Sequence, residues 1–293
     1  MASSDLPPPR KRFGQHFLRD KQLPQRMVAV AQVGQDDLVV EIGPGRGALT
    51  EVLLEQAAGV VAFELDRDLA AWLTTRFAGR RWRLYVGDVL KVDLAACVTE
   101  AREAWGLMAS PVKVVANVPY NLSTPIVEKL LAERHLWTDI VLMLQREVVW
   151  RLAATPGTKD YGYFSVIVQA ACEVTRLFDV PPTAFQPPPK VMSSVVRLAP
   201  RSTPVVPPEL TPYFYQVVSA AFGQRRKMLG GSLTQLGLPR AALEEALAKA
   251  GVAPASRPET LSVEAFVCVT QHLAAMMAPQ VYRLKGLDNS NAV

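Results

Sequence analysis

The sequence predicts an α/β fold, in which a parallel sheet covered by helices is followed by a small all-helical domain. From residue 38 onward, short apolar runs alternate with stretches of helical periodicity, the pattern typical of a parallel sheet with helical crossovers. Beyond residue 200 only helical patterns occur. Of the 293 residues, 49% are hydrophobic and 20% charged, as in an ordinary globular chain, and no apolar run approaches the roughly 18 residues of a membrane-spanning helix.

Five apolar runs are expected to form the strands of the sheet, and two of the segments between them are expected to be helices. The strands are predicted at residues 38–42, 60–63, 84–86, 114–116 and 140–144, and the helices at 49–56 and 68–77. In such a Rossmann-like sheet, ligands bind at the carboxyl ends of the strands. Functional residues are therefore expected directly after the strands.

A proline-rich segment predicts the domain boundary. Ten of the 23 prolines lie between residues 181 and 212, a density that neither a helix nor a central strand tolerates, with one strand-like interruption at 191–198. We therefore expect a catalytic domain over residues 1–200, a helical domain over 201–280 and a disordered tail over 281–293. Helices in the second domain are predicted at 213–222, 240–250 and 263–277.

Basic side chains are concentrated in two regions. Residues 1–35 hold six basic and two acidic side chains, and residues 200–240 hold five basic and one acidic, so each region has a net charge of +4. Such clusters contact nucleic-acid phosphates, although a solvated surface is the simpler alternative. Three cysteines and three histidines are too scattered for a disulfide framework or a zinc site, and the N-terminus lacks a secretory segment. We expect a monomeric cytoplasmic protein that binds neither a metal nor a membrane.

A glycine-rich loop with Gly43 and Gly45 follows the first predicted strand, where a ligand can approach the backbone closely. With Glu64 about 20 residues later, the loop fits both a dinucleotide site and an S-adenosylmethionine site. Three features favour S-adenosylmethionine: the GxGxG spacing, Glu41 just before the first glycine, and Asp88 after the third strand, where an acid can accept from an adenine amine. A tight turn without a ligand is the remaining alternative.

The segment Asn117-Val118-Pro119-Tyr120 follows the fourth predicted strand, at the same edge of the sheet as the glycine loop. An adenine amine is a weak nucleophile because its lone pair is delocalised into the ring. The carboxamide oxygen of Asn117 and the carbonyl of Pro119 would accept the amine hydrogens and localise that lone pair, while Tyr120 offers a ring for stacking. Alone the segment also fits an ordinary turn, but its position predicts methyl transfer to an adenine.

Further stretches occur in the order found in the ribosomal RNA adenine N6,N6-dimethyltransferase family. They are residues 12–18 (RFGQHFL), 145–148 (QREV), 161–163 (YGY), 185–191 (FQPPPKV), 222–227 (FGQRRK) and 257–262 (RPETLS). Over residues 10 to 275 the chain resembles this family, most closely its bacterial branch that acts on the 3′-terminal hairpin of small-subunit ribosomal RNA. Two residues depart from the family pattern: His16 stands where Asn is usual, which leaves its role open, and Val118 replaces Leu or Ile.

The resemblance implies four methyl transfers from S-adenosylmethionine to two adjacent adenines in a pre-ribosomal 30S particle, leaving S-adenosylhomocysteine. The donor contacts are expected from Gln15, His16, Leu18, Glu41, Gly43, Gly45, Glu64, Leu65, Asp88, Val89 and Asn117. Phe185 is expected to sandwich the flipped adenine against Tyr120, with a core aromatic as the alternative. RNA contacts are expected from Arg10, Lys11, Arg12, Arg146, Lys190, Arg225, Arg226 and Lys227, although the last three could instead dock the helical domain.

Other functions fit less well. A paralogue that methylates large-subunit ribosomal RNA and confers macrolide resistance shares several motifs, but the segment at 224–227 argues against it. A non-catalytic assembly or transcription factor on the same fold would not need the intact acidic residues and Asn117. A DNA adenine methyltransferase would need a target-recognition insertion, and the sequence shows none of useful size.

Overall fold

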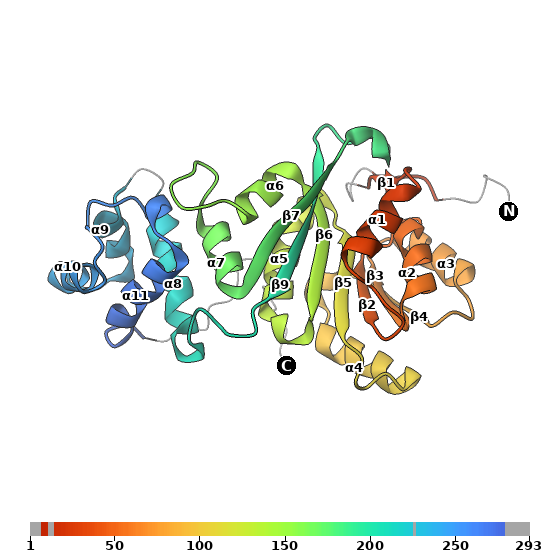
Figure 1. Cartoon of the computed structure of the whole chain (residues 1–293), viewed down its shortest axis with the longest axis horizontal. Coiled ribbons are helices and arrows are strands. Elements are labelled where there is room, and N and C mark those ends of the chain that lie inside the picture. Colours follow the sequence, from red (N-terminus) through yellow and green to blue (C-terminus); the bar gives the residue numbers. More distant parts are fainter. Residues whose placement is uncertain (1–6, 11–14, 225–226, 279–293) are drawn as a thin grey trace. The chain divides into compact units, whose positions relative to one another are not determined.

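The structure is a computed structural model of the chain, and it describes residues 7–10, 15–224 and 227–278 (Figure 1). The described chain forms two compact units, one with residues up to 149 and 175–200, the other with residues 150–174 and those from 201 onward. The expected catalytic domain over 1–200 included residues 150–174, which the structure groups with the second unit. Within that unit, helix α7 (Tyr163–Ala171) contacts α8 (Thr211–Phe222) and α11 (Val263–Ala274). The predicted tail, residues 281–293, lies outside the described residues. None of the described helices is long and apolar enough to cross a membrane.

The first unit is built on a seven-stranded sheet with the order β4-β3-β2-β5-β6-β9-β7. Its strands are β2 (Leu38–Ile42), β3 (Gly59–Glu64), β4 (Trp82–Val86), β5 (Val112–Asn117), β6 (Asp139–Gln145), β7 (Cys172–Val180) and β9 (Ser193–Pro200). The five strands predicted from the apolar runs are β2 to β6, and they pair in parallel. The predicted α/β fold is confirmed.

The sheet differs from the prediction at one edge, where β9 pairs antiparallel to β6. The proline-rich segment between β7 and β9 contains only the short strand β8 (Phe185–Gln186) and a 3-10 turn, with no helical crossover. A parallel connection needs such a crossover, so the chain reverses instead. Sheets of this class commonly carry an antiparallel edge.

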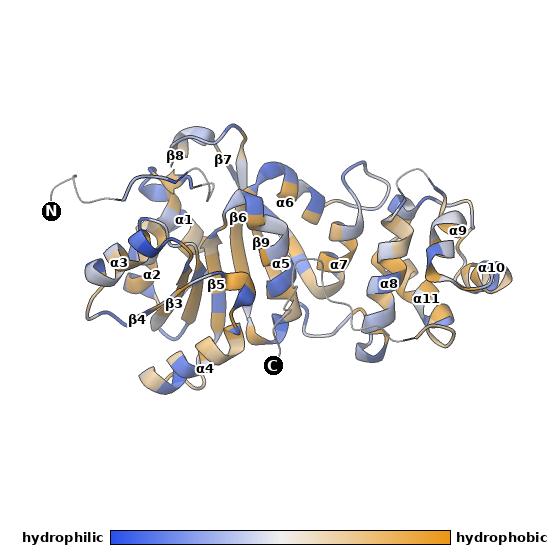
Figure 2. Ribbon diagram, turned by 180° about the vertical axis from the view of Figure 1, so that it is seen from behind, coloured by the Kyte–Doolittle hydropathy of each residue, from blue (hydrophilic) through white to orange (hydrophobic). Residues whose placement is uncertain are grey.

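Helices cover both faces of the parallel part. Figures 1 and 2, which view the molecule from opposite sides, show α1 on one face and α5 on the other. On the first face, α1 and α2 bury Leu23, Met27 and Leu53 against inward-facing valines of β2, β3, β5 and β6. The helices of this unit are α1 (Gln22–Val30), α2 (Ala48–Gln56), α3 (Arg67–Arg76), α4 (Leu94–Trp105) and α5 (Ser123–Ala132), and α6 (Arg146–Leu152) leads out of it.

Burial on both faces explains why the central strands are continuous apolar runs. All residues of β2 and β3 are buried, including the acids at positions 41 and 64, and Figure 2 shows the central strands in the hydrophobic colour. A strand with one solvated face would instead alternate apolar and polar residues. The two acids that interrupt these runs are therefore unexpected on packing grounds and point to a ligand.

The strand order places a crevice at the carboxyl ends of β2 and β5. From β2 the chain continues through β3 to β4 on one side, whereas β5 and β6 lie on the other side. Ligands of open α/β sheets bind at this reversal point. A two-stranded sheet of β1 (Phe17–Leu18) and β8 brings the N-terminal segment into the same unit, with Phe17 opposite Gln186 and Leu18 opposite Phe185.

The second unit is helical apart from the first residues of β7. It contains α7, α8, α9 (Leu229–Ser232), α10 (Arg240–Lys249) and α11. Helix α11 contacts both α8 and α10, and its buried Phe266 lies against Phe222 of α8 with ring centroids 5.7 Å apart. The helices predicted at 213–222, 240–250 and 263–277 correspond to α8, α10 and α11.

Candidate functional site

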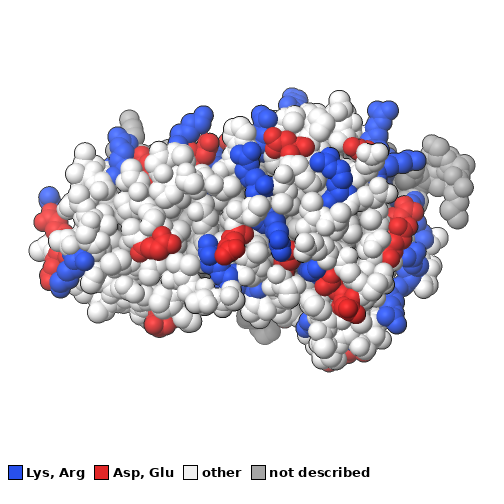
Figure 3. All heavy atoms as spheres, in the orientation of Figure 1, with Lys and Arg blue, Asp and Glu red and all other residues white. Residues whose placement is uncertain are grey.

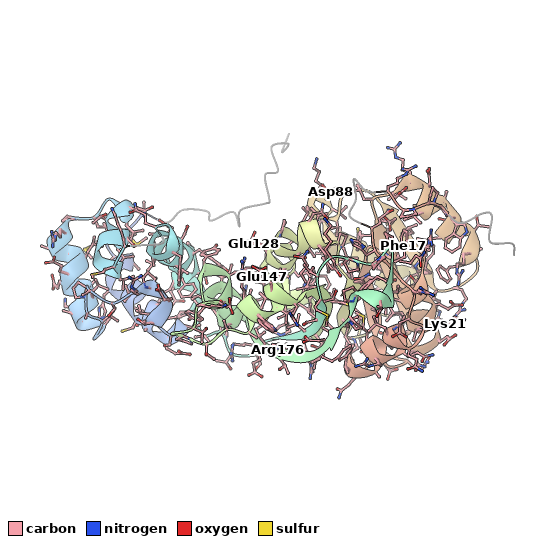
Figure 4. All side chains as sticks on the ribbon, turned by 90° about the horizontal axis from the view of Figure 1, so that it is seen from above. Phe17, Lys21, Asp88, Glu128, Glu147 and Arg176 are labelled. Carbon is pink, nitrogen blue, oxygen red and sulfur yellow. The ribbon has the colours of Figure 1, made fainter. Side chains whose placement is uncertain are left out.

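A cavity of about 360 Å³ lies at the carboxyl ends of β2, β3, β4 and β5. Its size is within the range of small-molecule sites. All eleven predicted donor residues, Asn117 among them, line it, and so do Pro119 and Tyr120. Figure 4 labels two of the lining residues, Phe17 from β1 and Asp88 from the loop after β4.

The glycine loop between β2 and α2 forms one wall. Gly43 and Gly45 have φ angles of 70° and 57°, in the left-handed region that favours glycine. A Cβ atom at Gly45 would lie 3.1 Å from the Phe17 ring, and one at Gly43 would lie 3.5 Å from Cδ of Pro119. Glycine thus allows the loop to contact both the N-terminal segment and the segment after β5.

Glu41 lies at the base of the cavity on β2, with 1% of its surface exposed. Its carboxyl accepts a hydrogen bond of 2.7 Å from Oγ1 of Thr50. Burial raises the pKa of Glu41 to about 8, the Thr50 hydrogen bond partly opposes this, and the nearby Glu64 raises it further. At neutral pH the carboxyl therefore carries its proton for most of the time in the protein without a ligand.

Glu64 ends β3 and joins two loops through its carboxyl group. One oxygen accepts from the backbone N–H of Gly45 at 3.2 Å, and the other accepts from that of Asp66 at 2.9 Å. Burial again raises the pKa, while these backbone hydrogen bonds lower it. A carboxylate offers about four lone-pair positions, so Glu64 can still accept from a further donor such as a hydroxyl group.

Three residues at the ends of β3 and β4 form the outer rim of the cavity. The Asp88 carboxylate caps the following 3-10 turn by accepting from the N–H of Leu90 at 3.0 Å. Val89 is buried, whereas Leu65 keeps 43% of its surface exposed although it lines the cavity. An exposed leucine beside an acid suits a flat, partly apolar ligand with an amino group at its edge.

The N-terminal strap, defined as residues 7–10 and 15–18, lines the cavity with residues 15–18. Gln15 donates to the Asp66 carboxylate at 3.2 Å and accepts from the N–H of Arg10 at 2.7 Å. The Arg10 guanidinium forms ion pairs with Asp66, at 3.3 Å, and with Asp68. The strap is therefore fixed to the start of α3.

Arg46 fixes the strap from the glycine loop. Its guanidinium lies 4.3 Å from the centre of the Phe17 ring and donates to the carbonyl of Pro7 at 2.9 Å. Burial lowers the pKa of Arg46. No sequence pattern singles out Arg46, because its two partners are distant along the chain.

Three carboxyl groups are buried at or next to the cavity, and two of them, Glu41 and Glu64, line it. Glu41, Glu64 and Asp66 are each less than 7% exposed. Among the described residues, the ion pair to Arg10 involves Asp66, and no ion pair joins Glu41 or Glu64. Buried carboxyls without cationic partners favour a ligand that brings positive charge.

The other end of the cavity contains Asn117 and Tyr120. The Asn117 amide nitrogen donates to the backbone carbonyl of His16 at 3.5 Å, which directs its oxygen elsewhere. The Pro119 carbonyl accepts from the N–H of Leu122 at 3.0 Å and has a second lone pair. The Tyr120 hydroxyl shares a hydrogen bond with Oγ of Ser193, a buried residue that the sequence analysis missed.

Comparison with known proteins agrees with the methyltransferase site expected from the sequence. The profile of the ribosomal RNA adenine dimethylase family matches residues 8–275. The chain belongs to this family. The predicted resemblance is thereby confirmed, and the chain is an enzyme of the methyltransferase class.

Relatives within the family share much of the sequence. The ribosomal RNA small subunit methyltransferase A of Syntrophotalea carbinolica is 45% identical over 258 residues, covering 88% of this chain and 94% of the relative. The protein of that name from Nitrosococcus oceani is 47% identical over 264 residues, covering 90% and 95%. The chain therefore spans nearly the whole length of these relatives.

Solved structures agree with the fold. The 23S rRNA methyltransferase ErmE has a TM-score of 0.65 and 26% identity, with 88% of this chain and 99% of that chain covered. A dimethyladenosine transferase from Plasmodium falciparum has a TM-score of 0.75 and 24% identity, with 89% and 98% covered. The second likeness concerns the fold alone.

Phe185 is not where the family resemblance led us to expect it. Its side chain is 2% exposed and packs in the core beside Leu23 and Met27 of α1, and it does not line the cavity. Pairing of β8 with β1 turns this ring inward. The structure thus agrees with the alternative of a core aromatic and offers no free ring face at Phe185.

The expected RNA-binding residues are dispersed. Lys190 and Lys227 are exposed, Arg146 begins α6, and Arg10 is held by its ion pairs at the strap. Figure 3 shows several further Lys and Arg side chains over β7 and its neighbours. Lys11, Arg12, Arg225 and Arg226 lie outside the described residues.

The described residues contain no group of three or more potential metal ligands. The functional residues missed from sequence are Thr50, Asp66, Arg46 and Ser193, which hold the predicted residues in place. Each is a polar residue whose partner lies in another segment. Only the three-dimensional arrangement identifies them.

Proposed function

We propose that this protein transfers methyl groups from S-adenosylmethionine to the N6 amines of two adjacent adenines in the 3′-terminal hairpin of small-subunit ribosomal RNA. One observation carries the proposal: the glycine loop and the Asn117 segment contact each other within one cavity. A Cβ atom added at Gly43 would lie only 3.5 Å from Pro119, so no layer of protein separates the two loops. A donor on the first loop would thus face a base on the second.

The cavity fits the donor on three grounds. Its volume suits a ligand of this size, its glycine loop allows close approach, and its uncompensated carboxyls suit a molecule with ammonium and sulfonium charges. We assign the methionine part to Gln15, His16, Leu18, Gly43 and Gly45, with Glu41 beneath it, the ribose hydroxyls to Glu64, and the adenine ring to Leu65, Asp88 and Val89.

S-adenosylmethionine supplies an electrophilic methyl group on its sulfonium, and the protein must present the amine to it. The Asn117 oxygen and the Pro119 carbonyl accept the amine hydrogens and localise the nitrogen lone pair toward the donor. The fixed Tyr120 ring stacks on the base. Most of the rate enhancement then comes from positioning, and no general base is required because the proton leaves after the nitrogen has become cationic.

The substrate is assigned to the small subunit because relatives with that name share 45% and 47% identity, against 26% for the 23S enzyme. The target adenines must be unpaired or extruded to reach the cavity. Lys190 and Lys227, together with Arg146 and the basic residues outside the described part, would contact RNA phosphates. We place the reaction in the cytoplasm, on a pre-ribosomal 30S particle, with the protein as a monomer.

Subunit specificity tests the proposal. Purified small and large subunits that lack adenine dimethylation are incubated separately with the protein and radiolabelled S-adenosylmethionine. We expect four methyl groups per small subunit and none on the large subunit. Label on the large subunit alone would assign the protein to the rival substrate, and no transfer to either, with donor binding intact, would indicate a non-catalytic role.

A further inference from the structure

His16 covers the ring of Tyr120. The imidazole and phenol rings are stacked, with centroids 5.6 Å apart and planes 28° from parallel. His16 Nδ1 donates to the carbonyl of Pro187 at 2.8 Å, and the His16 carbonyl accepts from Asn117. The hydrogen bond to Pro187 thus holds the imidazole, and the contact with Asn117 holds the backbone of His16.

The stacked rings lie at the end of the cavity that also contains the Asn117 carboxamide. His16, Asn117 and Tyr120 all line the cavity, and the backbone of His16 is bonded to Asn117 itself. An adenine whose amine reaches the Asn117 oxygen must lie close to the stacked rings. The imidazole thus stands where the target base would stack.

The base cannot slip between the two rings. A base between two stacked rings separates them by about 7 Å, twice the contact distance of roughly 3.5 Å. The observed 5.6 Å is too short. The imidazole must therefore leave the face of Tyr120, giving up its stacking contact and its hydrogen bond to Pro187.

Stacking alone would not drive this exchange, because one aromatic contact to Tyr120 replaces another. The difference must come from groups that the base has and the imidazole lacks. An adenine amine gains two acceptors, the Asn117 oxygen and the Pro119 carbonyl. A base without an amine at that position gains neither.

We propose that His16 is a specificity-determining gate that occupies the target-base position and yields to a base bearing a 6-amino group. The inference rests on the proposed function, since it assumes an adenine substrate. Such a competitor raises selectivity by penalising the wrong base, at some cost in affinity for the right one.

Base insertion can be measured with small subunits whose target adenine is replaced by 2-aminopurine, a fluorescent purine without a 6-amino group. In the wild type we expect little insertion of this base at saturating protein. His16→Ala should increase the inserted fraction about tenfold, since a ring contact and a hydrogen bond no longer oppose it. His16→Asn, which keeps a hydrogen-bond donor but no ring, should lie between them.

His135→Ala provides the matched control, because His135 is an exposed histidine on the turn before β6. It should behave as the wild type. If His16→Ala reduced insertion and His16→Phe restored it, His16 would be a stacking wall and the gate would be disproved. Unchanged insertion in His16→Ala would also disprove the gate. An altered donor affinity would then leave His16 only its assigned contact to the donor, and a lowered melting temperature alone would leave it a structural role. Methylation of unmodified small subunits by the wild type, measured in parallel, separates failure of the gate from failure of the proposed function.

Discussion

Replacement of Glu41 by glutamine should remove most of the pH dependence of donor binding. Glu41 is buried beneath the glycine loop, has a hydrogen bond from Thr50, and has a pKa of about 8 without a ligand. S-adenosylmethionine has a net positive charge, and a cation nearby stabilises the ionised carboxylate. Donor binding should therefore lower the pKa of Glu41 and release a proton.

The magnitude follows from that pKa. With a value of about 8 in the free protein, roughly 90% of Glu41 is protonated at pH 7, so about 0.9 proton should leave per donor bound. If the pKa falls well below 6.5 in the complex, the association constant should rise roughly eightfold between pH 6.5 and 7.5 and level off above about pH 9. The affinity increases with pH because only the ionised form favours the cation.

Isothermal titration calorimetry in buffers of different ionisation enthalpy measures both quantities. Glu41→Gln keeps an oxygen to accept from Thr50 and should bind the donor weakly, with little proton release across this range. S-adenosylhomocysteine lacks the sulfonium charge and should show a smaller pH dependence with the wild type. Proton release of the same size in Glu41→Gln, or an affinity that falls as pH rises, would refute the reasoning.

The same carboxyl affects stability without a ligand. Its pKa is raised in the folded state from 4.5, so the folded protein binds the proton more tightly than the unfolded chain. The contribution of Glu41 to the free energy of unfolding should be greatest below about pH 4.5 and should be lost as the pH rises toward 8. Melting temperatures between pH 6 and 8 should therefore decline in the wild type and decline less in Glu41→Gln.

Substitutions at three further residues test the assigned roles. Asn117→Ala should lower kcat by about 10² to 10³ with donor affinity retained, because an acceptor used in the transition state is lost; wild-type single-turnover rates would contradict this. Tyr120→Phe should retain more activity than Tyr120→Ala, which loses stacking worth roughly 1 to 3 kcal/mol per base, and equal losses would indicate that the hydroxyl matters more than the ring. Arg46→Ala should raise the donor dissociation rate about tenfold in stopped-flow experiments, because the strap loses two contacts, and an unchanged rate would show that the strap does not retain the donor.

The central strands were predictable because each is a short apolar run bounded by polar residues. The expected strand at 38–42 coincides with β2, and the other four fall within β3 to β6. Strand β7 was missed because it lies at the edge of the sheet, and seven of its nine residues are partly or fully exposed in an irregular order. Strands β1 and β8 have two residues each, too few for any periodicity.

The candidate site likewise has a part that was predictable from the sequence and a part that was not. Residues directly after strands, such as Gly43, Asp88 and Asn117, were predictable because parallel strands bring their carboxyl ends to one edge. The contacts of the strap were not, since Arg10 and Asp66 are 56 positions apart and only the folded chain joins them. Phe185 was misplaced because a local motif does not reveal which way a ring points once β8 pairs with β1.

The central claim is that one cavity presents a methyl donor to an adenine amine of the small-subunit hairpin. It is tested most directly by mass spectrometry of RNA fragments from unmodified small subunits after reaction with the wild type and with Asn117→Ala. The account predicts two adjacent N6,N6-dimethyladenosines in the 3′-terminal hairpin with the wild type, and almost none within the same time with Asn117→Ala. Methyl groups on another base or another atom, or equal product from both proteins, would contradict it.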